Sequence, residues 1–179
     1  MTHAPTGDVA SRAARIRLLM LDVDGVLTDG RLYFTAAGEE IKVFHSRDGH
    51  GLKLLQAGGV ELAIVTGRSS RAVERRAAEL GIRRVYQGIG DKAAVMDELL
   101  AELGIAGAEA AYMGDDVVDL PVMRRCGLAL TVPEAPEIVK RHAHYVAACP
   151  AGGGAVREAC ELILAAQGRL QPGLEAYLK

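Results

Sequence analysis

The sequence predicts an α/β fold in which helices cover both faces of a mostly parallel β-sheet. Short apolar runs rich in Leu, Val, Ile and Ala alternate with helix-like stretches along the whole chain. Half of the 179 residues are hydrophobic, so the chain can bury a substantial core. Strands that alternate with helices pair in parallel, because each helix carries the chain back to the same end of the sheet.

The first strand is predicted at residues 18–21, an apolar run without charge that suits burial on both faces. It ends at Asp22 and Asp24, which are followed by Gly25. Ligands of open α/β folds bind at the carboxyl ends of the strands. Two carboxylates there can hold a hard cation such as Mg²⁺, attack phosphorus or transfer protons. A simple turn is the competing interpretation, because Asp and Gly are common loop residues.

A β-hairpin is predicted directly after this acidic pair. Segments 31–34 and 40–44 are rich in β-forming residues and flank a short Gly-containing link. We expect the hairpin, about residues 28–45, to stand over the site as a flap. A hairpin is a small lid, so closing the site would need help from another subunit.

The remaining elements alternate in the same way. Further strands are expected at 60–65, 84–86, 110–113, 128–132 and 145–146. Helices are expected at 52–56, 71–80, 92–103, 117–125, 136–141 and 155–167, with Asp91 as the N-cap of the third. Residues 1–14 are expected to form a poorly ordered tail, and residues 15–179 a single domain.

Composition argues against several function classes. The net charge is −2 and no long basic block occurs, so neither nucleic-acid nor membrane binding is predicted. No apolar run suggests a membrane span, and the first residues lack the apolar core of a secretory signal. Three cysteines (Cys126, Cys149 and Cys160) without CxxC spacing favour neither a disulfide framework nor a zinc site. We expect a cytoplasmic protein.

Polar residues gather where other predicted strands end or helices begin. Thr66 follows the second strand of the sheet, Lys92 opens a helix, and Asp115, Asp116 and Asp119 follow the strand at 110–113. Singly, each could be a helix cap, a surface residue or a favourable charge at a helix start. Together, the carboxylates would repel one another without a cation or proton among them. A hydroxyl and a lysine on the same rim suit phosphoryl oxygens.

This set resembles the haloacid dehalogenase superfamily of phosphotransferases. The four motifs of that superfamily are met in order by residues 22–25, Thr66, Lys92 and residues 114–119. The two-aspartate first motif points to phosphatases within the superfamily. By this resemblance Asp22 attacks phosphorus and forms an aspartyl-phosphate that water then hydrolyses. Asp24 gives a proton to the departing oxygen and later takes one from water, while Thr66 and Lys92 hold the phosphoryl oxygens.

The resemblance also implies a magnesium site. Asp22, Asp115 and the backbone carbonyl of Asp24 would hold Mg²⁺, and Asp116 or Asp119 would orient these ligands.

The likeness narrows to the family of 3-deoxy-D-manno-octulosonate 8-phosphate phosphatases over about residues 16–170. It is carried by residues 27–30, 47–51, 64–68, 86–88, 114–123 and 152–158. Members of that family have a Rossmann-like fold with a hairpin flap and no cap domain, and they assemble as tetramers whose neighbours help to close each site. The resemblance thus implies a homotetramer that acts on an acidic sugar phosphate in lipopolysaccharide precursor synthesis. His45 and Ser46 depart from the usual family pattern, which bears on substrate preference.

The same resemblance implies the residues that bind the sugar phosphate. They are Asp24, His45, Ser46, Arg47, Asp48, Gly49, Lys53, Gly67, Arg68, Arg76 and Lys92. Arg68 directly follows the second motif and is well placed to meet the substrate's carboxylate or hydroxyls, and Arg47 is the obvious anion partner among residues 45–49. Arg76 lies in an Arg- and Glu-rich helix, where a solvated face of paired charges is the open alternative.

Three other functions stay open. A phosphatase acting on another acidic sugar, such as a nine-carbon sialic-acid-like 9-phosphate, would carry the same motifs. A receiver-like signalling domain also uses acidic residues, a Thr and a Lys on such a sheet. The order argues against it, because Asp22 and Asp24 both close the first strand and no lone aspartate ends a middle strand before Thr66. An inactive, assembly-only homologue is disfavoured, because every motif residue needed for turnover is present.

Overall fold

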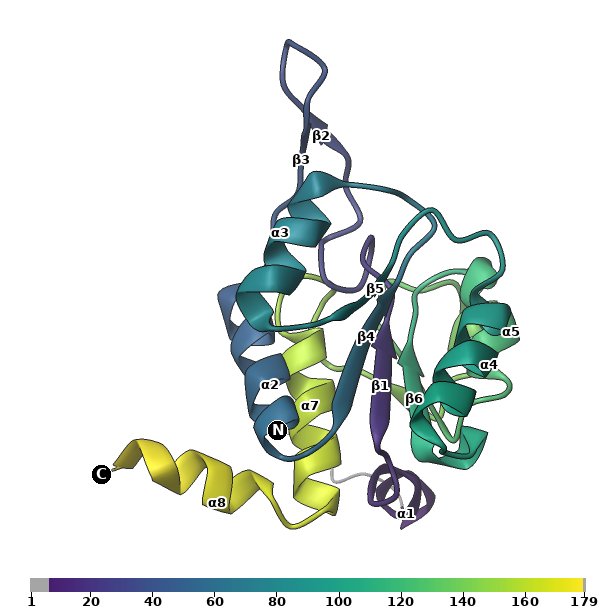
Figure 1. The fold of residues 1–179 in the computed structure, drawn as a ribbon, viewed down its shortest axis with the longest axis vertical. Helices are drawn as coiled ribbons and strands as arrows, with labels where there is room; N and C mark the ends of the chain where they lie inside the picture. The colour runs from purple at the N-terminus through teal and green to yellow at the C-terminus, as the bar shows by residue number, and fades with distance from the viewer. Residues whose placement is uncertain (1–6, 179) are drawn as a thin grey trace.

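The computed structural model describes residues 7–178, which form a sheet with helix layers on both faces (Figure 1). The strand order is β5-β4-β1-β6-β7-β8, and every neighbouring pair is parallel. The strands are β1 (Leu18–Leu21), β4 (Glu61–Val65), β5 (Arg84–Tyr86), β6 (Ala110–Met113), β7 (Leu128–Thr131) and β8 (Tyr145–Val146). The predicted fold class is confirmed, and the strand predicted at 145–146, β8, lies at an edge of the sheet.

The helices divide between the two faces of the sheet (Figure 1). One face carries α2 (Ser46–Ala57), α3 (Arg71–Leu80) and α7 (Ala155–Ala166), and the other carries α4 (Lys92–Leu103) and α5 (Leu120–Met123). The chain steps from β1 to β4 to β5 and then returns to β6 and β7. Because crossover connections are right-handed, this reversal places the later helices on the opposite face.

The remaining helical elements lie outside these two layers or link strands. They are α1 (Gly7–Ala13), α6 (Glu137–Lys140), α8 (Leu170–Glu175) and the 3₁₀ turns Gly107–Glu109, Val117–Asp119 and Ala176–Leu178. No helix of the described part of the chain is long and apolar enough to span a membrane.

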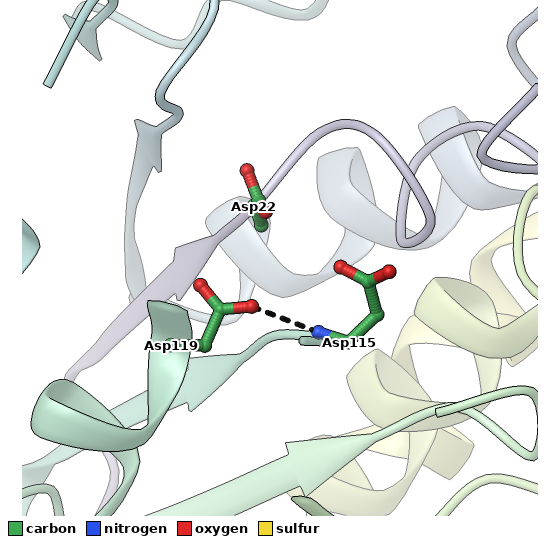
Figure 2. Close-up of side chains that lie close together, drawn as sticks. All are labelled: Asp22, Asp115 and Asp119. Carbon is green, nitrogen blue, oxygen red and sulfur yellow. Dashed lines mark hydrogen bonds between the residues drawn. The ribbon is translucent and has the colours of Figure 1, made fainter. Parts of the chain in front are cut away.

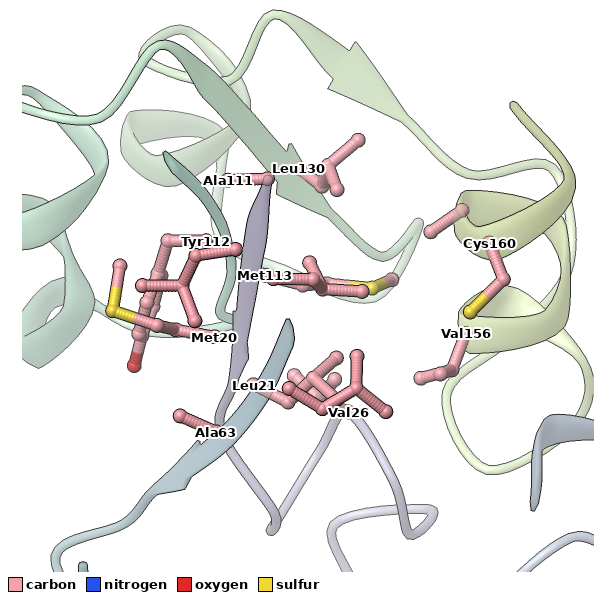
Figure 3. Close-up of a cluster of buried hydrophobic side chains, with 14 of the residues drawn as sticks. Met20, Leu21, Val26, Ala63, Ala111, Tyr112, Met113, Leu130, Val156 and Cys160 are labelled. Atoms are coloured by element: carbon pink, nitrogen blue, oxygen red, sulfur yellow. The ribbon is translucent and has the colours of Figure 1, made fainter. Parts of the chain in front are cut away.

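The central strand β1 is buried along its whole length between β4 and β6. Figure 3 shows Met20 and Tyr112 on one side of it and Leu21 and Met113 on the other, where α7 lies. Successive side chains of a strand alternate between faces, so a strand covered on both faces needs an unbroken apolar run. Leu21 pairs with Ile64 of β4 and with Met113 of β6, so the three strands end level at one edge.

Several predicted elements match the structure residue for residue. The strands at 84–86 and 110–113 and the helices at 71–80 and 92–103 have the predicted bounds. Asp91 caps α4, because its side chain accepts hydrogen bonds from the backbone N–H groups of Ala93 and Ala94. The predicted helix at 117–125 is instead a 3₁₀ turn followed by the short α5.

Helix α2 begins at Ser46, six residues before the start that the sequence predicts. Two glycines obscured this start, because glycine weakens a helical pattern. The structure explains their presence. A Cβ on Gly51 would lie 3.0 Å from the Cα of Arg157 in α7, and one on Gly49 would lie 2.2 Å from a guanidinium nitrogen of Arg76 in α3. The glycines therefore allow α2 to pack closely against both neighbours.

The expectation of a poorly ordered tail at residues 1–14 is wrong for its second half. Residues 1–6 lie outside the described residues. Residues 7–13 form α1, which buries Val9 and Ala13 and packs against α7 and β7. The pattern is too short to predict a helix from sequence, because α1 depends on the surface it covers rather than on its own propensity. Helix α8, after the predicted closing helix, was likewise not predicted.

The predicted hairpin is confirmed as a two-stranded antiparallel unit that projects from the domain (Figure 1). Its strands are β2 (Tyr33–Phe34) and β3 (Glu40–Ile41), with Tyr33 opposite Ile41. Large apolar side chains of the hairpin are about half exposed, namely Leu32, Phe34, Ile41 and Val43.

Replacement of Gly51 by Ala should lower the free energy of unfolding by about 1–3 kcal/mol, because the added methyl group overpacks the contact between α2 and α7. Gly173→Ala in α8 is the matched control, since a Cβ there meets no atom within 4 Å. It should be neutral or stabilising by up to about 1 kcal/mol, because Ala is the better helix former. Denaturant unfolding followed by circular dichroism measures both. Equal effects of the two substitutions would contradict the packing explanation.

Candidate active site

Three carboxylates meet at the edge of the sheet where β1 and β6 end. Oxygen atoms of Asp22, Asp115 and Asp119 lie within 4.8 Å of one another. Figure 2 shows that they come from three segments: the end of β1, the loop after β6 and the 3₁₀ turn that follows this loop. The level ends of the parallel strands account for the meeting of the first two. The sequence predicted this gathering.

Lys92, the first residue of α4, is buried beside these carboxylates. Its Nζ lies 3.0 Å from Oδ2 of Asp22 and 2.7 Å from Oδ1 of Asp119. Burial by itself lowers the pKa of Lys92, but the two carboxylates outweigh this and raise the pKa above its ordinary value. Lys92 therefore stays protonated and supplies positive charge at the centre of the cluster.

Asp119 organises the loop that carries Asp115. Its Oδ2 accepts hydrogen bonds from the backbone N–H groups of Asp115 at 3.0 Å and Asp116 at 3.1 Å. Its Oδ1 accepts from the hydroxyl of Tyr112 at 2.6 Å as well as from Lys92. Burial raises the pKa of Tyr112 well above its ordinary value, so this hydroxyl remains a neutral donor. Asp119 is wholly buried and fully engaged in these contacts.

Tyr112 was missed by the sequence analysis. It lies inside an apolar strand, where an aromatic residue reads as core, and no local signal points to its hydroxyl. The side chain of Asp116, by contrast, is exposed and accepts from the N–H of Val117, which caps its own turn. Of the two residues predicted to orient metal ligands, only Asp119 directs its side chain into the cluster.

The charge state of the cluster indicates a cation site. Burial, together with the neighbouring carboxylates of Asp22 and Asp119, raises the pKa of Asp115 to about 7. Burial also raises the pKa of Asp22, although Lys92 opposes this shift. A Cβ on Gly25 would lie 2.1 Å from Oδ2 of Asp115, so the glycine of the first motif leaves this carboxylate its space. Crowded, buried carboxylate oxygens fit Mg²⁺, which prefers hard oxygen ligands and offsets their repulsion.

A pocket of about 310 Å³ opens onto the cluster. It collects both predicted catalytic aspartates and the predicted phosphate- and sugar-binding residues of the second and third motifs. The predicted residues that line it are Asp22, Asp24, Thr66, Gly67, Arg68 and Lys92. The volume suits a small ligand, and its walls offer carboxylates, a hydroxyl and two cations.

The other predicted substrate-binding residues lie outside this pocket. His45, Asp48, Gly49 and Arg76 line a separate cavity of about 10 Å³, room for one water molecule at most. Arg47 lines a third pocket beside α7. Ser46 and Lys53 are exposed on α2 and line none of these cavities. Within one copy of the chain, the predicted substrate-binding residues thus form two groups. Only the group that lines the active-site pocket lies beside the carboxylate cluster.

Asp48 makes structural contacts rather than lining the pocket. Its Oδ1 accepts from the backbone N–H of Arg157 at 2.8 Å, and its Oδ2 from that of Gly154 at 3.3 Å. These are free donors at the start of α7, so the Asp48 carboxylate caps that helix and ties it to α2. Burial raises the pKa of Asp48.

The flap supplies two site residues that the sequence analysis did not name. Lys42 contacts Oδ1 of Asp24, and Glu40 accepts a hydrogen bond from Arg68 at 2.6 Å. A two-residue strand carries too little pattern to say which of its side chains face inward.

The chain is similar to known phosphatases over nearly its whole length. Residues 33–127 match the family model of haloacid dehalogenase-like hydrolases. The 3-deoxy-D-manno-octulosonate 8-phosphate phosphatase of Escherichia coli (strain K12) is 47% identical over 165 residues, which cover 92% of this chain and 88% of that protein. The Yersinia pestis phosphatase of the same name is 48% identical, with the same coverage.

A solved structure of such a phosphatase also resembles this chain. The crystal structure of the 3-deoxy-D-manno-octulosonate 8-phosphate phosphatase from Moraxella catarrhalis, in complex with a magnesium ion, a phosphate ion and a KDO molecule, is 41% identical. The two structures superimpose with a TM-score of 0.94. The matched region covers 96% of this chain and 99% of the Moraxella catarrhalis chain.

Stabilisation by Mg²⁺ should grow as the pH rises from 5 to 8. In the cation-free fold Asp115 binds a proton up to a pH of about 7, whereas its ordinary pKa is 3.8. Between these values the folded state holds the extra proton, so the free energy of unfolding falls as the pH rises. Mg²⁺ held at Asp115 would bind the ionised carboxylate and so remove this penalty.

The measurement is the difference in thermal unfolding midpoint between Mg²⁺ and chelator at the two pH values. Asp115→Asn is the control, because an amide does not titrate. In this variant, both the fall of stability with pH in chelator and the growth of the Mg²⁺ effect with pH should be weaker. An equal effect of Mg²⁺ at pH 5 and pH 8 would refute the assignment of this titration to Asp115.

Proposed function

The chain belongs to the haloacid dehalogenase-like hydrolase family, and we propose on this basis that it is a Mg²⁺-dependent phosphatase that hydrolyses 3-deoxy-D-manno-octulosonate 8-phosphate. The products are the free sugar acid and phosphate. One observation carries the proposal: a single pocket holds Asp22, Asp24, Thr66 and Lys92 beside a carboxylate cluster, in a chain similar throughout to phosphatases of this substrate. The family match favours this function over a receiver-like domain.

Asp22 is the proposed nucleophile. The backbone N–H of Val23 donates to its Oδ1 at 2.7 Å, and Lys92 lies 3.0 Å from its Oδ2, so the carboxylate is fixed toward the pocket. As Asp22 bonds to phosphorus, the sugar oxygen leaves and takes a proton from Asp24. Asp24 then accepts a proton from the water that hydrolyses the aspartyl-phosphate. Thr66 is buried in the pocket wall, where its hydroxyl can hold a phosphoryl oxygen.

The magnesium site is proposed at Asp22, Asp115 and the backbone carbonyl of Asp24. When bound there, the cation supplies positive charge that offsets both the carboxylates and the phosphoryl oxygens. The protein's own contribution is to hold the ligands. Asp119 fixes the backbone of Asp115, and Lys92 holds Asp22 and Asp119 together from the other side.

Arg68 is the proposed partner for the sugar carboxylate. Its side chain is 47% exposed and lines the mouth of the pocket, where an anionic substrate enters. Arg47 and Lys53 are exposed cations outside the pocket of their own copy. They act on substrate in this proposal only through the pocket of a neighbouring copy.

We therefore also propose a homotetramer in which the hairpins pack against one another. The apolar side chains of Phe34, Ile41 and Val43 are about half exposed on a hairpin with two paired residues per strand. Such a hairpin is marginally stable alone, and clustered exposed apolar side chains mark interaction sites.

We also propose a cytoplasmic location, with residues 15–179 acting as one phosphatase domain. The three cysteines are free, which fits a reducing compartment.

Phosphate release from 3-deoxy-D-manno-octulosonate 8-phosphate should exceed that from other sugar phosphates by at least about tenfold in kcat/KM, because Arg68 recognises the acidic sugar. A chelator should abolish phosphate release.

Asp22→Asn should lower turnover by about 10³-fold or more, since the amide is a poor nucleophile. Asp97→Asn, an exposed residue of α4, is the matched control and should keep turnover. Preference for a nine-carbon 9-phosphate would keep the chemistry and reject the named sugar. Near wild-type turnover of Asp22→Asn would reject the nucleophile.

Sedimentation should give a mass of four chains for the protein and a smaller one for Ile41→Lys, because the charge disrupts apolar packing of the hairpins. Ile138→Lys, a similarly exposed apolar position on α6, should leave the tetramer intact. A monomeric parent protein, or equal dissociation of the two variants, would refute the hairpin interface.

A further inference from the structure

Four charged side chains of alternating sign form a ring beside the active-site pocket, and two of them, Asp24 and Arg68, line it. Lys42 contacts Oδ1 of Asp24 and lies 3.5 Å from a carboxylate oxygen of Glu40. The same oxygen of Glu40 accepts from Arg68 at 2.6 Å, and Nε of Arg68 lies 3.6 Å from Oδ2 of Asp24. Lys42 and Glu40 belong to the flap, whereas Asp24 and Arg68 follow strands β1 and β4. The ring therefore joins the flap to the catalytic loops.

Lys42 is unusually buried for a lysine on a projecting hairpin. Its side chain is 4% exposed, whereas its neighbours Ile41 and Val43 are about half exposed. Alternate residues of an extended segment face opposite sides, so the charged residues Glu40 and Lys42 face the pocket and the apolar ones face away. A lysine is almost never buried without a partner, and the partner here is Asp24.

The contact leaves the two oxygens of Asp24 in different surroundings. Oδ1 is engaged by Lys42, whereas Oδ2 is buried and has no hydrogen-bond partner among the described residues. Asp24 also lines the pocket. An unpaired buried acceptor costs free energy, so its presence in a site asks for an explanation. Oδ2 is the oxygen left for proton transfer with the substrate.

We propose that Lys42 is a positioning residue for Asp24: from the closed flap it holds Oδ1 so that Oδ2 faces the substrate. This inference rests on the proposed function. It means that the flap completes the acid/base group rather than merely excluding water, and that an open flap leaves Asp24 unoriented. As the bond from phosphorus to the sugar oxygen breaks, its electron pair stays on that oxygen, which takes the proton from Oδ2 of Asp24 while Asp22 bonds to phosphorus.

A second ion pair, between Glu40 and Arg68, also anchors the flap, and its removal through Glu40 provides a control. Glu40 binds Arg68, whose side chain is 47% exposed, so the pair is screened by water and contributes little to stability. Glu40→Gln weakens the closed flap but leaves Lys42 on Asp24. Lys42→Met removes the charge at similar length, and Lys42→Arg retains it.

The test compares two leaving groups in the first turnover, which isolates the step that breaks the ester bond. A sugar oxygen needs a proton to leave, whereas 4-nitrophenolate does not. Lys42→Met should slow the first turnover of 3-deoxy-D-manno-octulosonate 8-phosphate by about 10–100-fold, and that of 4-nitrophenyl phosphate by less than about threefold. Lys42→Arg should recover most of the loss. Glu40→Gln should keep the parent ratio of the two rates.

An equal loss on both substrates, or no loss on either, would overturn the positioning role. A shift of the rate ratio in Glu40→Gln as large as in Lys42→Met would also overturn it, since flap closure alone would then explain the effect. Thermal unfolding in Mg²⁺ verifies that each variant is folded. The parent protein separates this inference from the proposed function, because failure of the parent to hydrolyse either ester would reject the function itself.

Discussion

The burial of several carboxylates around one ammonium group is the constraint on which the rest of the structure depends. Asp22, Asp115 and Asp119 are close enough to repel one another, and Lys92 neutralises only part of their charge. Such a cluster survives burial only when each oxygen is held and the remaining charge meets a cation or a proton. The pKa of Asp115 is raised to about 7, because Lys92 does not fully neutralise the negative charge around this partly buried carboxylate. Mg²⁺ is the natural complement.

The surrounding elements follow from this constraint. Both carboxylate oxygens of Asp119 accept hydrogen bonds from surrounding donors, and these bonds fix the loop after β6. Asp91 caps α4 so that this helix begins at Lys92 and points the ammonium at the cluster. A Cβ on Gly114 would lie 2.4 Å from Cγ of Asp119, so only glycine leaves room for that carboxylate. The carboxylate cluster is thus built as much by helix caps and by glycines without side chains as by the carboxylates themselves.

The flap has two faces with opposite chemistry. The apolar side chains of Ile41 and Val43 face away from the pocket, and the charged side chains of Lys42 and Glu40 face inward. In an isolated copy this arrangement exposes apolar surface on a hairpin too small to be stable alone. Assembly of copies through the outer face would hold the inner face over the pocket. The proposed tetramer and the proposed role of Lys42 are therefore linked, because the neighbouring residues Ile41 and Lys42 of the hairpin serve one each.

The sequence by itself determined the sheet and the position of the site. Alternating apolar runs and helical stretches require parallel strands, and parallel strands end at a common edge, so Asp22, Thr66 and Asp115 had to meet there. Local signals also sufficed for the Asp91 cap. Only the tertiary structure decided which side chains contact one another. The hydroxyl of Tyr112, the ammonium of Lys42 and the carboxylate of Asp48 all find partners in other segments of the chain. A local pattern reports backbone preference and burial, whereas the partner of a polar side chain is set by how distant segments pack.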